Sequence, residues 1–215
     1  MKKLSKLLAI CLLVLISSQT FAQKIGIQGG INLANMLVKD DQTTYSDDFK
    51  MNIGFNGGVT FEMGFGDLIS LEAGLIANTR GFKWDVDIMG STMKTKVNLL
   101  YIDVPVLLKV GPALGPVKVF GAAGPYIGYG IAGKYKIEAG GESSSEDVKW
   151  GSNADESDFK PLDFGAKFGV GAEAMGFTFG AYYCLGLANI SPSTEGGGKI
   201  TNKLISLSVG YKFGK

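Results

Sequence analysis

The sequence has no histidine, and only two of its 215 residues are cysteine. Without histidine the chain cannot build a Ser-His-Asp triad, a histidine-dependent barrel lipase or a His-rich metal site. Cys11 lies in an N-terminal apolar run, so Cys184 is the only cysteine of the expected mature chain, and no internal disulfide can form. We therefore expect neither an enzyme nor a cofactor or bound metal.

Charge and long apolar runs are also scarce. Charged residues make up 19% of the chain, below the usual share of about 25%. No stretch after residue 22 reaches the roughly 18 uncharged apolar residues of a transmembrane helix. Glycine is abundant instead, and all 32 glycines follow residue 22. Because glycine costs about 1 kcal/mol relative to alanine inside a helix, the composition favours an all-β chain with many turns.

The first 22 residues have the features of a secretory signal peptide. Lys2, Lys3 and Lys6 form a positive n-region, an apolar core follows at Leu7, and small residues precede a cleavage site after Ala22. Cleavage removes three of the 21 basic residues and leaves 18 against 20 acidic residues. Such a balance offers no basic field for a nucleic acid, so we expect no nucleic-acid partner.

The expected mature chain, residues 23–215, forms one domain with eight segments of alternating apolar and polar residues. Period-two alternation is typical of strands, and each segment is close to the 9–11 residues, roughly, that a tilted strand needs to cross a bilayer. The segments are 25–33, 52–63, 69–81, 97–110, 117–131, 162–174, 177–187 and 204–213. Ten charged residues lie within them, all opposite the apolar face: Glu62, Glu72, Arg80, Asp103, Lys109, Lys118, Asp163, Lys167, Glu173 and Lys212.

The connections between these segments alternate in length. Three are tight turns, at 64–68, 111–116 and 175–176, and four are longer and more polar, at 34–51, 82–96, 132–161 and 188–203. This pattern predicts an eight-stranded antiparallel up-and-down transmembrane β-barrel, with short periplasmic turns and four longer extracellular loops, located in the outer membrane. A soluble barrel of the lipocalin kind is the alternative, because alternation does not reveal which face is inside.

Two details of the pattern carry further expectations. Pro105 lies inside segment 97–110 and cannot donate a hydrogen bond to the ladder, so we expect a bulge there. The connection 132–161 holds seven acidic residues against four lysines. Its composition predicts a segment too polar and too flexible to bury a core.

Four sequence stretches resemble the PorT-like outer-membrane β-barrel proteins, often labelled "porin family", of Bacteroidetes-type bacteria. The stretches are Tyr101-Ile-Asp-Val-Pro-Val-Leu-Leu-Lys109, Gly124-Pro-Tyr-Ile-Gly128, Phe164-Gly-Ala-Lys-Phe-Gly-Val-Gly-Ala-Glu173 and Tyr183-Cys-Leu-Gly-Leu-Ala-Asn-Ile190. The resemblance covers the whole mature chain, and the proline of the fourth strand is shared. It implies a barrel but no activity, since most members have no assigned role and one branch takes part in protein secretion.

Two short motifs invite a functional interpretation that their surroundings do not support. Gly128 to Gly133 match a GxGxxG pattern, but a phosphate-binding loop needs a following helix and a Ser or Thr after the lysine, whereas Tyr135 follows Lys134. Asp85 and Asp87 could touch Ca²⁺, yet no glycine-kinked loop with further ligands follows them. We interpret both as structural segments.

The charged face of the predicted strands is the feature of the sequence that most directly indicates a function. An eight-stranded barrel has just enough interior space for side chains, and an unpaired buried charge is strongly destabilising. We therefore expect the ten charges to form a paired structural network in a filled polar lumen, so that the barrel is a structural or surface-interaction protein. The alternatives are a narrow passive porin for small solutes and an accessory component of protein secretion.

The expected partners follow from the same interpretation. They are outer-membrane lipid, the barrel-assembly machinery during biogenesis, and an unidentified extracellular ligand at the long loops. The barrel is expected to be a monomer.

Overall fold

The computed structural model describes residues 23–39, 49–88, 91–140, 142–194 and 197–214. The predicted signal peptide, residues 1–22, lies outside the described residues. The strands are β1 (Gln23–Lys39), β2 (Asn52–Phe65), β3 (Ile69–Ile88), β4 (Ser91–Val110), β5 (Ala113–Leu114), β6 (Val117–Ala139), β7 (Glu142–Asp147), β8 (Leu162–Ala174), β9 (Phe177–Gly186) and β10 (Lys199–Phe213). In the described part of the chain no helix is long and apolar enough to cross a membrane.

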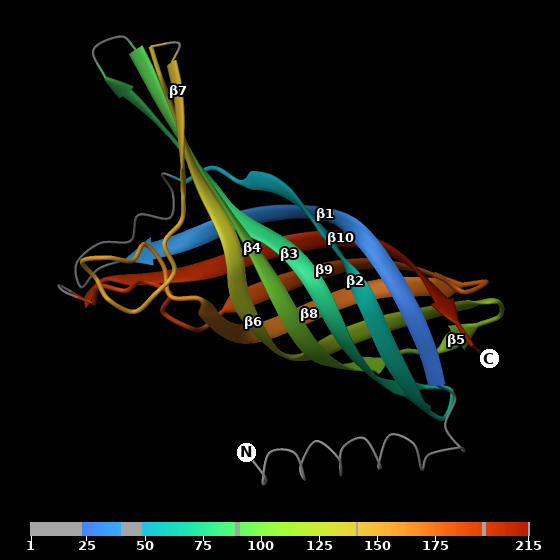
Figure 1. The fold of residues 1–215 in the computed structure, drawn as a ribbon. Coiled ribbons are helices and arrows are strands. Elements are labelled where there is room, and N and C mark those ends of the chain that lie inside the picture. The colour runs from blue at the N-terminus through green and yellow to red at the C-terminus, as the bar shows by residue number, and fades with distance from the viewer. Residues whose placement is uncertain (1–22, 40–48, 89–90, 141, 195–196, 215) are drawn as a thin grey trace, which may run out of the picture.

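Eight of these strands close into a ring (Figure 1). Their order is β4-β3-β2-β1-β10-β9-β8-β6, every pairing is antiparallel, and β6 also pairs with β4. The first and last strands join along their whole length, from Ile25 opposite Phe213 to Lys39 opposite Lys199. Two short strands lie off the ring, β5 and β7, and both pair with β6. The predicted all-β, up-and-down barrel is confirmed.

The apolar residues lie on the outside of the ring and the polar residues inside it. Outward-facing Val104 and Val170 are 47% and 66% exposed, whereas inward-facing Arg80 and Asp163 are 1% and 0% exposed. This is the reverse of a soluble barrel, which buries its apolar side chains. On β4 the outward apolar residues begin at Leu100 and continue to the end of the strand. At about 3.3 Å per residue and a tilt of roughly 40°, this stretch spans about 25 Å, the height of the apolar band of a membrane barrel.

Inward-facing glycines let the strands of this narrow ring approach closely. A Cβ atom at Gly30 would collide with the backbone oxygen of Leu207 on β10, and one at Gly124 would collide with the backbone oxygen of Val106 on β4. Glycine inside a strand often marks such a close backbone approach. The high glycine content thus has a structural cause beyond the turns.

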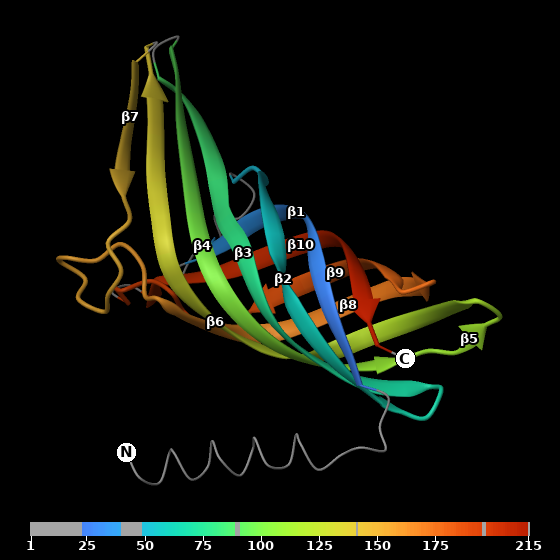
Figure 2. The ribbon, with the colours of Figure 1, turned by 45° about the vertical axis from the view of Figure 1, so that its right-hand side comes forward.

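Two predicted connections contain long strand segments, and this part of the sequence prediction is wrong. Residues 82–96 form the far ends of β3 and β4, which stay paired up to Ile88 opposite Ser91. Within 132–161, β6 continues to Ala139 and β7 pairs with it. Polar residues do not prevent ladder hydrogen bonds, so a solvated hairpin can have a loop-like composition. The result is an extension of β3, β4, β6 and β7 that projects well beyond the barrel (Figure 2).

The bulge expected at Pro105 is also misplaced. Pro105 lies opposite Tyr126 in a continuous register with β6, and the register shift lies between Leu100 and Tyr101. On its other side, the pairs of β3 with β4 pass from Ala73–Val106 to Ile76–Asp103 without a shift. The missing donor of proline therefore interrupts the ladder locally without inserting an extra residue.

The outward position of Val104 gives a test of which face of the strands contacts lipid. Val104→Arg should lower the free energy of unfolding by about 2–4 kcal/mol, because a cation near the bilayer midplane is poorly solvated. The measurement is urea unfolding in lipid vesicles, followed by tryptophan fluorescence. Leu114→Arg is the matched control, since Leu114 is 62% exposed and lies in the short strand β5 off the ring. Equal, small effects of both substitutions would contradict the assignment.

Candidate functional site

Five charged side chains from five strands meet in the lumen as one cluster, called here the lower cluster. Lys109 on β4 places its Nζ 2.9 Å from Glu62, 3.1 Å from Glu72 and 2.5 Å from Glu173. Lys212 on β10 lies 2.6 Å from Glu173 and 3.4 Å from Glu72, and it also pairs with Glu62. Three carboxylates thus share two ammonium groups in the lumen near the short-turn end of the barrel.

The strand register explains why these residues need each other. Glu62 and Glu72 lie directly opposite one another on β2 and β3, and like charges in that position are destabilising. Lys109 and Lys212 reach them from β4 and β10, so the lysines offset the repulsion and link strands that are not adjacent in the ring. Lys109 also lies over the ring of Phe120, with Nζ 4.0 Å from its centroid.

A second group of charges, the upper cluster, surrounds Arg80 on β3. Its guanidinium pairs with Asp103 at 2.5 Å and with Asp163. The same guanidinium lies 4.5 Å from the ring centroid of Tyr101 and 5.0 Å from that of Tyr126. All five side chains are buried. Charge pairing and cation–π contacts therefore both compensate the guanidinium for its lost hydration.

A chain of amide and hydroxyl groups occupies the lumen beside the upper cluster. Asn78 donates to Asp103 at 2.7 Å and accepts from Asn32 at 3.2 Å, and Asn32 in turn accepts from Asn56 at 2.9 Å and from Ser206 at 2.8 Å. None of these amide and hydroxyl side chains is among the ten charges predicted for the lumen. The sequence does indicate such a network, because asparagines recur at inward positions of β1, β2 and β3.

Two of the ten predicted lumen charges lie outside both clusters. Lys167 is buried and holds its Nζ 4.4 Å from the ring centroid of Tyr182. Lys118 is half-buried and lies opposite Glu173 in the ladder. Neither lysine makes an ion pair with a side chain in the described residues. The structure therefore brings the other eight charges together and leaves these two apart.

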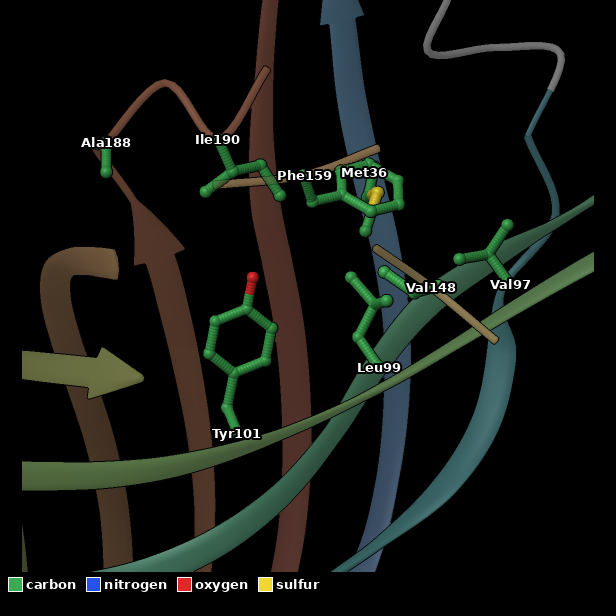
Figure 3. Close-up of a cluster of buried hydrophobic side chains, with 8 residues drawn as sticks. All are labelled: Met36, Val97, Leu99, Tyr101, Val148, Phe159, Ala188 and Ile190. Carbon is green, nitrogen blue, oxygen red and sulfur yellow. The ribbon is translucent and has the colours of Figure 1, made fainter. Parts of the chain in front are cut away.

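A cluster of buried apolar side chains, called here the apolar cap, adjoins the upper cluster through Tyr101, which belongs to both (Figure 3). It contains Met36, Val97, Leu99, Tyr101, Val148, Phe159, Ala188 and Ile190, all buried. The backbone ties the cap to the barrel, because Val148 N donates to the oxygen of Gly133 on β6 and Ile190 N donates to the oxygen of Ile200 on β10. The prediction that 132–161 buries no core is wrong. Val148 and Phe159, two isolated apolar residues in this polar segment, are the feature of the sequence that indicates a buried core.

The other sequence motifs lie in structural roles. Gly128 to Gly133 form part of strand β6, not a loop before a helix. Cys184 is buried, and Asp85 pairs with Lys50 at 2.7 Å. Within the described ranges, no group of three or more Asp, Glu or Cys side chains is arranged to hold a metal ion. The chemistry that this lumen supports is charge pairing between strands.

Comparison with known proteins places the chain in a family. Residues 19–191 match the family described as outer membrane protein beta-barrel domain. The chain belongs to this family. Membership implies an outer-membrane location, which agrees with the apolar outer face of the ring. No curated protein matches the sequence significantly.

Several solved outer-membrane barrels are similar to this family member in strand arrangement. Ail, the attachment invasion locus protein of Yersinia pestis, is 16% identical with a TM-score of 0.40, and the match covers 89% of this chain and 99% of Ail. Neisserial surface protein A is 13% identical with a TM-score of 0.41, covering 89% and 97%. Outer membrane protein W of E. coli is 12% identical with a TM-score of 0.41, covering 91% and 100%. Similarity at this level carries no information about function.

The lower cluster of this outer-membrane barrel predicts a coupled loss of stability. Lys109→Met should lower the free energy of unfolding by about 3–5 kcal/mol, because three buried carboxylates would then share one lysine. Adding Glu72→Gln should cost less than the sum of the single effects, with a coupling of about 0.5–3 kcal/mol. Urea unfolding in lipid vesicles measures all three variants.

Lys134→Met is the control for this experiment. Lys134 pairs with Asp147 at 3.6 Å, but both side chains are exposed, 69% and 84%. Exposed pairs contribute little to stability, so this variant should unfold like the wild type. Additive effects of Lys109→Met and Glu72→Gln would contradict a paired network.

Proposed function

We propose that this outer-membrane barrel is closed and non-conducting, and that it acts through the structure at its long-connection end. The observation that carries the proposal is the occupied lumen. Ion pairs cross it at two levels, and the apolar cap covers it at one end. A structural or surface-interaction role fits such an interior.

The proposal disfavours the narrow passive porin. A conducting lumen needs a continuous path along which water or polar groups keep an ion solvated. In this barrel Arg80 and Lys109 are each 1% exposed and Asp163 is fully buried. Their charges are directed at one another and at neighbouring aromatic rings. No observation on the described residues favours an accessory role in secretion.

The part of the barrel available to a partner is the extension of β3, β4, β6 and β7. It projects beyond the ring (Figures 1 and 2), and its strands are held together by regular pairing rather than left as separate loops. A paired sheet presents a defined surface at a low entropic cost of binding. We propose that an extracellular ligand binds this extension.

The remaining parts of the proposal concern biogenesis and orientation. The chain is exported by a signal peptide cleaved after Ala22, inserted as a monomer by the barrel-assembly machinery, and oriented with its short turns in the periplasm. The resemblance of Tyr101–Lys109 to the fourth strand of PorT-like barrels supports a relationship to that group. The supporting geometry is that both described ends of the chain lie at the short-turn end of the ring (Figure 1).

Cysteine labelling on whole cells tests which end faces outward. In a Cys184→Ser background, Ser144→Cys should react with a membrane-impermeant maleimide, because Ser144 lies in β7 of the extension and is exposed. Asp67→Cys should not react, since Asp67 lies in the turn between β2 and β3 at the opposite end. Lysed cells provide the control in which both positions should react.

A photo-crosslinker attached at the same two positions extends the test to the interaction. On intact cells, the probe at position 144 should yield a crosslinked species and the probe at position 67 should not. The reverse labelling pattern would overturn the orientation. Crosslinking at neither position, on cells in which the barrel is correctly assembled, would count against a surface-interaction role.

A further inference from the structure

Four lysines lie side by side across one row of the extension. Lys50 is opposite Lys83 on β3, Lys83 is opposite Lys96 on β4, and Lys96 is opposite Lys136 on β6. Directly opposite residues in an antiparallel sheet point to the same face, with Cβ atoms about 4.5–5.5 Å apart. Three adjacent strands, together with Lys50 in an isolated bridge just before β2, therefore present four ammonium groups on one face.

Repulsion between these four ammonium groups destabilises the row unless anions lie close to it. Like charges directly opposite one another are destabilising. The next row along the sheet supplies only two acids, because Asp85 and Glu138 flank a fifth lysine, Lys94.

Both of these acids already have a partner within the row. Lys50 donates a hydrogen bond to Asp85 at 2.7 Å, and Lys136 donates one to Glu138 at 2.6 Å. These hydrogen bonds hold the pKa of each carboxyl below its usual value. At neutral pH both carboxylates are therefore negatively charged, and each is already paired with one lysine.

The other three lysines have no such partner. Lys83, Lys94 and Lys96 make no ion pair with any side chain in the described residues. Together with Lys50 and Lys136 they line a hollow of about 550 Å³ on this face of the extension. The hollow thus holds five lysines against two carboxylates, a local excess of positive charge.

The position of this face relative to the membrane indicates what fills the hollow. Lys94 and Lys96 have the same parity on β4 as Ile102 and Val104, so the lysine face continues the lipid-facing surface of the barrel. Lys96 comes four residues beyond Leu100, where the outward apolar residues begin. At about 3.3 Å per residue and a tilt of roughly 40°, Lys96 lies about 10 Å beyond the hydrocarbon. That is the height of lipid headgroups, and a lysine stem can extend further toward them.

We propose that the lysine row binds the phosphate groups of anionic lipid headgroups in the leaflet at this end of the barrel. A soluble polyanion has the same charge, but it would not require the lysines to lie on the continuation of the lipid-facing surface. The site holds the extension at the membrane surface and neutralises its lysine repulsion. This inference goes beyond the proposed function, since it does not depend on whether the lumen conducts.

The test measures lipid selectivity of the full barrel in phosphatidylcholine vesicles that contain spin-labelled phosphatidylglycerol or spin-labelled phosphatidylcholine. The wild type should prefer phosphatidylglycerol, and Lys83→Gln/Lys96→Gln should reduce that preference about fivefold for each lysine removed. Lys83→Arg/Lys96→Arg should restore it. Lys149→Gln/Lys160→Gln is the matched control, because it removes the same charge from a segment outside the row and should leave selectivity unchanged.

Two results would overturn the proposal. One is equal selectivity of the wild type and Lys83→Gln/Lys96→Gln, with folding of both verified by heat-dependent electrophoretic mobility. The other is binding of heparin to the barrel in pure phosphatidylcholine vesicles that depends on Lys83 and Lys96, without any preference for phosphatidylglycerol. That second outcome would assign the row to a soluble polyanion. A conducting lumen would contradict the proposed function but would leave this result unaffected.

Discussion

The requirement that buried charges be paired organises this barrel. With only eight strands in the ring, side chains from opposite walls can touch, and Lys109 reaches carboxylates on β2, β3 and β8 at once. Each of those carboxylates would be strongly destabilising alone, and so would the lysine. Five of the six ion pairs described in the lower cluster join strands that are not neighbours, so the cluster acts as a set of crosslinks across the ring. Arg80 provides the same kind of link between β4 and β8 through Asp103 and Asp163.

Because side chains fill the lumen, the surfaces available to a partner lie outside the ring. The apolar cap uses residues from the segment after β7 and from the connection before β10, so parts of the long connections fold back to close the barrel. The remainder of that end extends as paired strands. One face of the extension carries Phe82 and Trp84, which pack near Phe49, and the other carries the lysine row. The extension is thus a two-faced sheet, with a different kind of contact available on each face.

The sequence predicted the parts of this structure that depend on alternation alone. The eight strands, and the placement of charges such as Arg80 and Lys109 on one face of them, follow from period-two patterning. Which face lies inside does not follow from alternation; the alternating lengths of the connections indicated it. Which charges pair could not be predicted, because contacts such as Lys109 with Glu173 depend on register and ring closure. The extension was missed because solvated strands and loops share a polar composition, as at Lys94 and Lys96. The bulge was misplaced because proline can lose a ladder bond without shifting the register.

The central claim is that paired charges and the apolar cap close the lumen. Single-channel recording of the full barrel in planar bilayers tests it most directly. Wild-type protein should show no stable open level above the bare bilayer, because ion pairs cross the lumen at two levels and the apolar cap closes one end. A steady wild-type conductance would show that ions pass these side chains, and it would contradict the account.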